Sequence, residues 1–399
     1  MNSSGLSKHR LTRLHDLMRG HVDRGVAPGL VSVVSRRGAV HVDVIGAQAL
    51  GGAPMQRGTI FRISSMTKPI TAAATMILVE ECKLRLDEPV DRLLPELVDR
   101  KVLKRIDGPL DDTVPAKRPI SVRDLLTFRM GFGIVMAPPG TYPIQIAMAE
   151  QKIGGDGPPN PSTTPATDEW IRRLGTLPLM HQPGETWMYH TGSDVLGVLI
   201  ARASGQALET FLRERLFEPL GMTDTGFSVP ATQIDRLATS YWTNPGVLEV
   251  YDEAKGGQWS RPPAFPSGGG GLVSTVDDYL AFGQMMLNKG IHGTARILSR
   301  PSVELMTTDH LTPEQKADAG VILGDNRGWG FGVAMVTRRD DMAGSVGRFG
   351  WDGGLGTSYC SDPREDMVGV LMTQAAWTSP SPPGVYLDFW TSAYQAIDD

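Results

Sequence analysis

Strand patterns joined by short turns occur at both ends of this 399-residue chain, and they constrain its fold more than any other feature. Near the start, residues 30–35 and 40–44 form two such segments around an Arg-Gly turn. Near the end, residues 329–337, 356–360 and 367–373 have the same character. Because short hairpin links favour antiparallel pairing, we expect one antiparallel sheet built from both termini.

The patterns between the two ends are mostly helical. Amphipathic spacing also predicts a helix at each end of the chain, at residues 11–22 and 386–397. The helices expected in between cover residues 122–128, 169–174, 194–204, 208–217 and 276–288. The sequence therefore indicates a mixed α/β (α+β) fold, with a sheet flanked by helices and a helical part inserted.

The length fits about two domains of roughly 100–200 residues each. We expect a discontinuous α/β domain from residues 1–85 and 255–399, and a helical domain from residues 86–254. The helical domain would carry a Pro/Gly-rich loop at residues 131–167, which shows little periodicity. A loop this long is usually functional or disordered, and we expect it to form a wall or lid of a pocket. Six side chains around this loop either line that pocket or pack in the core: Met130, Phe132, Met136, Tyr142, Met148 and Trp187.

Charge and hydropathy exclude several classes of partner. The net charge is −5 without a large single-sign block, so no nucleic-acid-binding surface is expected. The longest apolar run, residues 72–79, is too short to span a membrane, and the polar start lacks the apolar core of a secretory signal. We therefore expect a cytoplasmic protein without membrane contact, a monomer or small homo-oligomer whose partner is a small molecule.

The only Ser-x-x-Lys pattern in the chain, Ser65 to Lys68, carries the strongest chemical signal. A strand end leads there into an Ala-rich apolar helix, and residues i and i+3 of a helix are neighbours, so Lys68 can reach the Ser65 hydroxyl. Burial favours the neutral form of lysine, and the helix dipole stabilises negative charge developing at the serine. This arrangement would activate a nucleophile. The alternative is a chance match, with the serine as a helix cap and Lys68 in solvent.

Several segments in addition carry a family resemblance. The chain resembles the superfamily of serine β-lactamases, penicillin-binding proteins and family VIII carboxylesterases, and it is most similar to the carboxylesterases. The matching segments follow one another in family order: residues 60–74, 120–127, 183–189, 217–222, 268–275 and 350–354. The resemblance implies the β-lactamase/transpeptidase-like fold of class C enzymes, with an α/β domain from both termini and a helical domain.

The resemblance also implies catalytic roles. Ser65 would be the acylated nucleophile and Lys68 its proton acceptor or relay. Tyr189, at the position of the family's Tyr-x-Asn element, would share the proton with them. A nearby ammonium lowers the pKa of a phenol, so a tyrosinate base is expected. The backbone amides of Ser65 and Gly354 would form the oxyanion hole.

Two departures from the family pattern bear on the substrate. Thr191 replaces the asparagine that typically contacts an acylamino side chain. Trp351, Asp352 and Gly353 stand where most lactamases and penicillin-binding enzymes have Lys-Thr-Gly, so the cation that binds a substrate carboxylate is missing and Asp352 would repel one. Trp351 matches the esterase branch, whereas Asp352 has no counterpart there and is otherwise a turn residue. We expect these four residues and His190 to contact substrate. His190 is a pocket or structural residue rather than a triad base, because the chain has no Gly-x-Ser-x-Gly motif.

The sequence therefore predicts a serine carboxylesterase that hydrolyses small or medium esters through an acyl-enzyme on Ser65. No cofactor is expected, and no metal-ligand motif occurs. The alternatives on the same scaffold are a β-lactamase, a D-amino-acid peptidase or amidase, and an acyltransferase. A non-catalytic, penicillin-binding-like sensor is the remote alternative.

Overall fold

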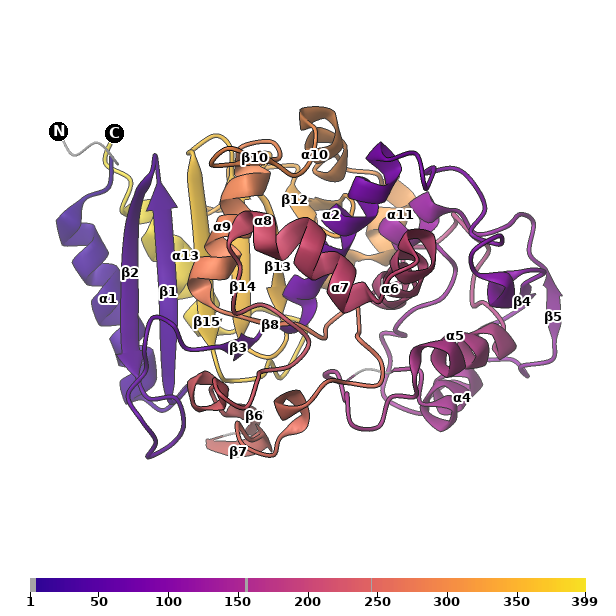
Figure 1. The fold of residues 1–399 in the computed structure, drawn as a ribbon, viewed down its shortest axis with the longest axis horizontal. Coiled ribbons are helices and arrows are strands. Elements are labelled where there is room, and N and C mark those ends of the chain that lie inside the picture. Colours follow the sequence, from indigo (N-terminus) through magenta and orange to yellow (C-terminus); the bar gives the residue numbers. More distant parts are fainter. Residues whose placement is uncertain (1–4, 155–156, 245) are drawn as a thin grey trace.

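A seven-stranded antiparallel sheet forms the largest element of the protein, in a computed structural model that describes residues 5–154, 157–244 and 246–399 (Figure 1). The strand order is β11-β12-β13-β14-β15-β1-β2. The two ends of the chain meet where β1 pairs with β15, and Val33 lies opposite Val370. This confirms the predicted sheet from both termini. Its strands are β1 (Gly29–Arg36), β2 (Ala39–Gly46), β11 (Arg327–Trp329), β12 (Ala334–Val336), β13 (Phe349–Gly353), β14 (Thr357–Asp362) and β15 (Met367–Thr373).

Two details of this sheet differ from the prediction. The single strand expected at residues 329–337 is a hairpin of β11 and β12, which turns at Gly332 with a φ of +69°. A Cβ on Gly332 would lie 2.7 Å from the Lys68 carbonyl oxygen, so the turn packs directly on the helix that follows Ser65. The other difference is β13, which was missed because two glycines and an aspartate in five residues are unfavourable for strands.

Helices cover both faces of the sheet (Figure 1). The predicted terminal helices are α1 (Lys8–Asp23) and α13 (Gly384–Gln395), which pack on one face, whereas α9 (Val276–Leu287) packs on the other. Strand β1 divides its side chains accordingly, with Leu30 and Val34 toward α1 and α13 and Val31 and Val33 toward the main core. Burial on both faces explains why β1 carries apolar side chains on both of its sides.

The middle of the chain is mainly helical, and its helices α4, α5 and α6 lie on the side of α2 (Thr67–Glu80) away from the terminal helices (Figure 1). Helix α6 packs against both α2 and α3, and one hydrophobic cluster runs from β1 through α2 into α6. The predicted domain boundaries therefore cross a shared core and stay a prediction. The helices of this part are α3 (Val122–Leu126), α4 (Pro143–Gln151), α5 (Thr167–Thr176), α6 (Thr191–Ser204), α7 (Leu208–Leu212) and α8 (Glu218–Leu220).

The Pro/Gly-rich segment 131–167 has more structure than its composition predicts. Helix α4 begins at Pro143 within it, and a proline at the first helical position is favourable because no N–H partner is needed there. Residues 155–156 of the segment lie outside the described residues.

Short elements complete the fold. Helices α10 (Arg300–Met306), α11 (Pro313–Asp318) and α12 (Gly320–Leu323) precede β11. Within the described residues, four small antiparallel pairs accompany the main sheet: β3 (Phe61–Arg62) with β8 (Val273–Ser274), β4 (Lys101–Leu103) with β5 (Thr113–Pro115), β6 (Ser240–Asn244) with β7 (Val247–Asp252), and β9 (Ile291–His292) with β10 (Ala295–Arg296).

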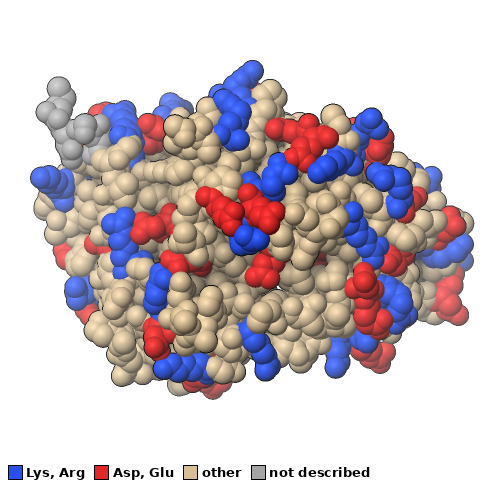
Figure 2. Space-filling model, in the orientation of Figure 1, with Lys and Arg blue, Asp and Glu red and all other residues tan. Residues whose placement is uncertain are grey.

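The surface carries charges of both signs. Lys and Arg alternate with Asp and Glu over the face seen in Figure 2, without a large area of one sign. Among the residues the structure describes, no single helix is long and apolar enough to cross a membrane. The pair Thr191–Ser204 and Leu208–Leu220, bent by 81°, has the required length and composition only when taken together.

Candidate active site

Ser65 lies in a short 3-10 turn, Ser64–Met66, between β3 and α2. The preceding Ser64 has a φ of +45°, a left-handed conformation that is strained for a residue with a side chain. The turn leads into α2, so Lys68 follows one turn later and its Nζ lies 2.9 Å from Ser65 Oγ. The predicted helix near the serine and the predicted Ser–Lys contact are both confirmed.

The Lys68 ammonium group is completely buried. Its Nζ contacts the Gly269 carbonyl oxygen at 2.6 Å and His190 Nδ1 at 3.1 Å, in addition to Ser65. Burial lowers the pKa of Lys68 to about 7, although the carboxylate of Asp194 acts in the opposite direction. Lys68 can therefore exchange a proton with Ser65 near neutral pH.

Tyr189 faces this pair with its hydroxyl group, and its interaction with Ser65 acts to lower the pKa of the phenol. The indole N–H of Trp351 donates a hydrogen bond to the same oxygen, at 2.7 Å. Burial raises the pKa of Tyr189 above its ordinary value. The expectation that a neighbouring ammonium lowers this pKa is wrong, because burial of the phenol dominates. Lys68 Nζ itself lies over the ring, 4.6 Å from its centroid. The phenol thus keeps its proton at neutral pH.

An aromatic cluster holds the Tyr189 ring in place. Phe128 meets the ring edge-on at a centroid distance of 5.7 Å, and Trp187 stacks on it at 5.7 Å. Trp329 packs in turn between Phe128 and Trp351, with centroids 4.8 Å from each. The cluster spans elements of the helical part and of the sheet, and it fixes the position of the Tyr189 hydroxyl relative to Ser65.

His190 and Asp194 form a pair beside Lys68, in which Asp194 is buried and His190 is partly exposed at the cavity wall. Asp194, in the first turn of α6, has its Oδ2 3.1 Å from His190 Nε2. Its Oδ1 accepts hydrogen bonds from Ser267 Oγ at 2.6 Å and from the Gly269 amide at 2.9 Å. Asp194 and Gly269 were not predicted from the sequence as site residues. The available signal was an acidic residue at the start of a predicted helix, four positions after a histidine beside the candidate tyrosine.

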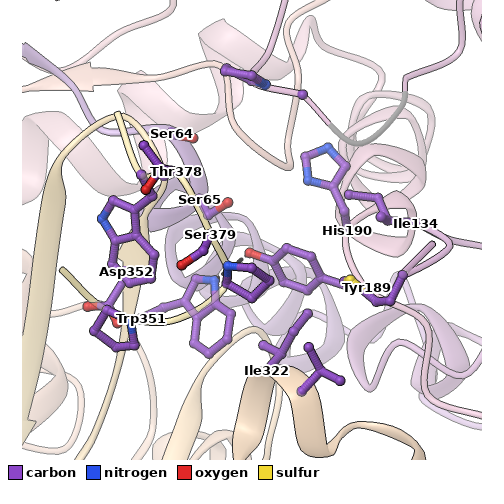
Figure 3. A pocket seen from close by; sticks show the side chains of 18 of the residues that line it. Ser64, Ser65, Ile134, Tyr189, His190, Ile322, Trp351, Asp352, Thr378 and Ser379 are labelled. Atoms are coloured by element: carbon purple, nitrogen blue, oxygen red, sulfur yellow. Dashed lines mark hydrogen bonds between the residues drawn. The ribbon is translucent and has the colours of Figure 1, made fainter. Parts of the chain in front are cut away.

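A cavity of about 700 Å³ opens in front of Ser65. Figure 3 shows Ser65, Tyr189, His190 and Trp351 around it. Of the predicted site residues in the described part of the chain, six line the cavity: Ser65, Tyr189, His190, Trp351, Asp352 and Gly354.

Two predicted substrate contacts lie outside that lining. Thr191 is buried as the first residue of α6, and Gly353 packs against Ile63, whose carbonyl oxygen would lie 2.3 Å from an added Cβ. Of the six apolar and aromatic residues around the Pro/Gly-rich segment, only Met136 contributes to the wall; Met130, Phe132 and Met148 are buried in the core.

The cavity wall is mainly apolar. Its apolar members come from four separate segments. Ile134 and Val135 belong to the segment predicted to form a wall or lid, whereas five members were not predicted from the sequence: Trp242, Val321, Ile322, Trp377 and Pro380. Two charged residues interrupt this wall. Arg327 donates to the carbonyl oxygens of Leu323 and Ile322, and the carboxyl group of Asp352 accepts from Ser358. Burial raises the pKa of Asp352. Within the described residues, no group of His, Cys, Asp and Glu is arranged to hold a metal ion.

An antiparallel sheet from both termini, a helical part beside it and a buried Ser–Lys pair in a cavity together define the class of β-lactamase-fold hydrolases. The sequence matches the family model described as Beta-lactamase over residues 14–383, and the chain belongs to this family. This agrees with the family predicted from the motifs.

Three relatives cover most of the chain. Protein Rv1367c of Mycobacterium tuberculosis is 41% identical over 362 residues, 88% of this chain and 87% of its own length. Esterase EstB of Burkholderia gladioli is 28% identical, covering 89% and 88% of the two chains. The solved structure of EstCE1, a hydrolase with promiscuous acyltransferase activity, has a TM-score of 0.80 at 26% identity, covering 96% of this chain and 98% of that one.

Proposed function

We propose that this protein is a serine carboxylesterase that hydrolyses neutral, largely apolar esters through an acyl-enzyme on Ser65. One observation carries the proposal: Lys68 Nζ lies 2.9 Å from Ser65 Oγ in complete burial, at the base of a mainly apolar cavity. A neutral amine in that position is a general base for the hydroxyl group. The similarity to esterase EstB and EstCE1 supports ester hydrolysis as the reaction.

In the acylation step, Ser65 Oγ attacks the carbonyl carbon of the ester while its proton passes to Lys68 Nζ. The carbonyl oxygen becomes an oxyanion, for which the amides of Ser65 and Gly354 are the proposed donors. When the tetrahedral intermediate collapses, the bond to the alcohol oxygen breaks. The Lys68 ammonium returns its proton to this oxygen, so the alcohol leaves neutral and Lys68 is ready for the second step.

In the deacylation step, a water molecule gives a proton to Lys68 and attacks the acyl carbon. The bond to Ser65 Oγ then breaks, and Oγ regains the proton from Lys68. Tyr189 keeps its own proton because its pKa is raised, so its role is to donate a hydrogen bond near Ser65 and the leaving oxygen. This assignment makes Lys68 the base and Tyr189 a hydrogen-bond donor, in place of the tyrosinate expected from the sequence.

The charges at the cavity wall favour an uncharged substrate. Asp352 stands where lactamases carry the lysine of Lys-Thr-Gly, and the nearest arginine in the wall, Arg327, is engaged with two backbone carbonyls. A β-lactam or peptide carboxylate would therefore meet a carboxyl group rather than a free cation. Apolar acyl or alcohol groups can instead fill the space between Met136, Trp242 and Trp377.

The test is a panel of p-nitrophenyl esters from acetate to octanoate, beside nitrocefin and a D-alanyl amide, with intact-mass detection of the acyl-enzyme. We expect ester turnover to exceed turnover of the other two substrates, and peptide mapping to place the acyl group on Ser65 rather than on the neighbouring Ser64. Faster nitrocefin or D-alanyl amide turnover would instead favour a lactamase or peptidase. Acylation at another residue, or none, would refute the proposal.

Replacing Trp351 by Phe should lower kcat for the preferred ester about 3- to 10-fold, because the variant loses one hydrogen bond to Tyr189, worth about 0.5–1.5 kcal/mol. The ring cluster would persist. The matched control is Trp170→Phe, which removes a buried indole N–H that donates to Ile153 outside the cavity wall. Steady-state kinetics of both variants check the prediction, and equal kcat values for the two would contradict it.

A further inference from the structure

The pair of His190 and Asp194 has no part in the steps above, although His190 contacts the base directly. We propose that His190 and Asp194 are positioning residues that orient the Lys68 amine so that its lone pair faces Ser65. The inference deepens the proposed function and rests on it, since it concerns how the general base of that reaction is oriented.

Counting donors and acceptors around Lys68 supports this role. Asp194 accepts from His190 Nε2, so this nitrogen carries the imidazole proton and Nδ1 presents its lone pair to Lys68. The Gly269 carbonyl oxygen is a second acceptor for Lys68. A neutral amine has two N–H groups and one lone pair. When His190 Nδ1 and Gly269 take the two N–H groups, the lone pair is left for the Ser65 hydroxyl.

Asp194 reaches Lys68 by a second route as well. Its Oδ1 accepts from the Gly269 amide and from Ser267 Oγ, so the same carboxylate holds the loop whose carbonyl receives the other Lys68 N–H. Both acceptors of the amine are thus anchored to one side chain. Asp194 itself lies in the first turn of α6, where a negative charge is favourable.

The backbone of His190 is strained in a way that serves this geometry. Its φ of +83° and ψ of −64° are the angles of a γ-turn, and the Thr191 amide donates to the Tyr189 carbonyl across it at 3.2 Å. Such turns are rare for residues with side chains. This one places Tyr189 and His190 on neighbouring sides of Lys68, which links the positioning pair to the hydrogen-bond donor of the proposed mechanism.

The titratable groups that surround Lys68 come from two parts of the fold. His190 and Asp194 approach from the start of α6, and Tyr189 lies directly before them. Asp352 of β13 acts on Tyr189 from the sheet. Among these groups, Asp194 alone both carries a charge that favours the ammonium form of Lys68 and is connected to Lys68 through hydrogen bonds. Substituting Asp194 therefore tests the orientation of the Lys68 amine separately from its burial.

The principal experiment is the Asp194→Asn variant, assayed for kcat, KM and the pH profile on the preferred ester. An asparagine that keeps the Gly269 contact turns its NH₂ group toward His190 Nε2, which moves the imidazole proton to Nδ1. That N–H then competes with Ser65 for the Lys68 lone pair. We expect kcat to fall about 10- to 100-fold with KM within twofold, as for other partners that orient a catalytic group.

The pH profile distinguishes a positioning role from a merely structural one, because a structural role would not shift the profile along the pH axis. Activity requires neutral Lys68, so it rises with pH through the pKa of this group. Removing the Asp194 charge disfavours the ammonium, so the rise should occur at lower pH in Asp194→Asn even though the plateau is lower. The matched control is Asp278→Asn, because Asp278 is also a buried first-turn carboxylate that accepts from a backbone amide and a hydroxyl, at Asp224 and Thr225.

A pair of His190 variants tests the hydrogen-bond path. In His190→Gln, the side-chain oxygen can accept from Lys68 while the NH₂ group donates to Asp194, so kcat should stay within about fivefold of the wild type. In His190→Ala, both contacts are lost and kcat should fall at least as far as in Asp194→Asn. Both variants have the same backbone strain at φ +83°. The difference between their kcat values therefore measures the loss of the side-chain contacts with Lys68 and Asp194.

Failure of the positioning role can be distinguished from failure of the proposed esterase function. Absence of an acyl group on Ser65 in the wild type refutes the esterase mechanism itself. If Ser65 is acylated but Asp194→Asn keeps the wild-type kcat, or loses kcat without the shift to lower pH, the positioning role is overturned. Equal losses in His190→Gln and His190→Ala overturn it as well.

Discussion

Replacing Lys68 by Met is expected to lower kcat/KM for a p-nitrophenyl ester about 10³- to 10⁴-fold, toward the level of Ser65→Ala. Methionine fills nearly the same volume but cannot accept the proton of Ser65. General-base catalysis is lost as a whole, because Tyr189 is protonated at neutral pH and His190 Nδ1 contacts Lys68 rather than Ser65 in the wild type. Steady-state kinetics beside Ser65→Ala, which sets the background, measure the loss.

The direction in which activity changes with pH can also be predicted. The pKa of Lys68 is lowered to about 7, so the fraction of neutral amine increases as the pH rises through 7. Wild-type kcat/KM should therefore rise from about pH 6 to a plateau above pH 8, and the residual activity of Lys68→Met should lack this rise.

Lys255→Met is the control, because Lys255 is exposed and its ion pair is with the exposed Asp235. It should retain wild-type kinetics and the wild-type pH profile. If Lys68→Met kept the rise near pH 7, or lost less than about tenfold in kcat/KM, another group would be the base and the assignment of Lys68 would fail.

The sequence predicted those parts of the fold whose signals are local. The alternation of residues 40–44 and the short turn before them were enough for the first hairpin, and the spacing of Ser65 and Lys68 was enough for their contact. Both follow from the geometry of one element. Strand β13 could not be predicted from its local sequence, because its pairing with β12 and β14, rather than its own composition, makes it a strand.

Residues of the site could be predicted from the sequence only where they belong to a recognisable motif. The contact between Asp194 and the Gly269 amide joins residues 75 positions apart, and the contact of His190 with Lys68 depends on a γ-turn that no helix or strand pattern indicates. The pKa of Tyr189 could not be obtained from the sequence either. Its direction depends on whether burial or the neighbouring ammonium dominates, and that requires the position of Lys68 over the ring.

The largest expected effect on stability comes from Arg62, in β3 just before the nucleophile turn. Its guanidinium group donates through Nε to Asp252 Oδ2 at 2.8 Å, and both side chains are almost completely buried. Replacing Arg62 by Met leaves the Asp252 carboxylate buried without its counter-ion. We expect the free energy of unfolding to decrease by about 3–5 kcal/mol, measured by urea denaturation followed by far-UV circular dichroism.

Two matched variants separate this loss from a general effect of removing arginine. Arg57 makes a similar two-pronged contact with Asp277, but the pair is exposed, so Arg57→Met should cost no more than about 1 kcal/mol. The double variant Arg62→Met with Asp252→Asn removes the unpaired charge and keeps an acceptor for the Gln258 amide, so it should recover part of the loss. If Arg62→Met cost no more than Arg57→Met, the buried pair would not be what stabilises this junction. The strand would then be held in front of Ser65 by its backbone pairing with β8 and its apolar contacts alone.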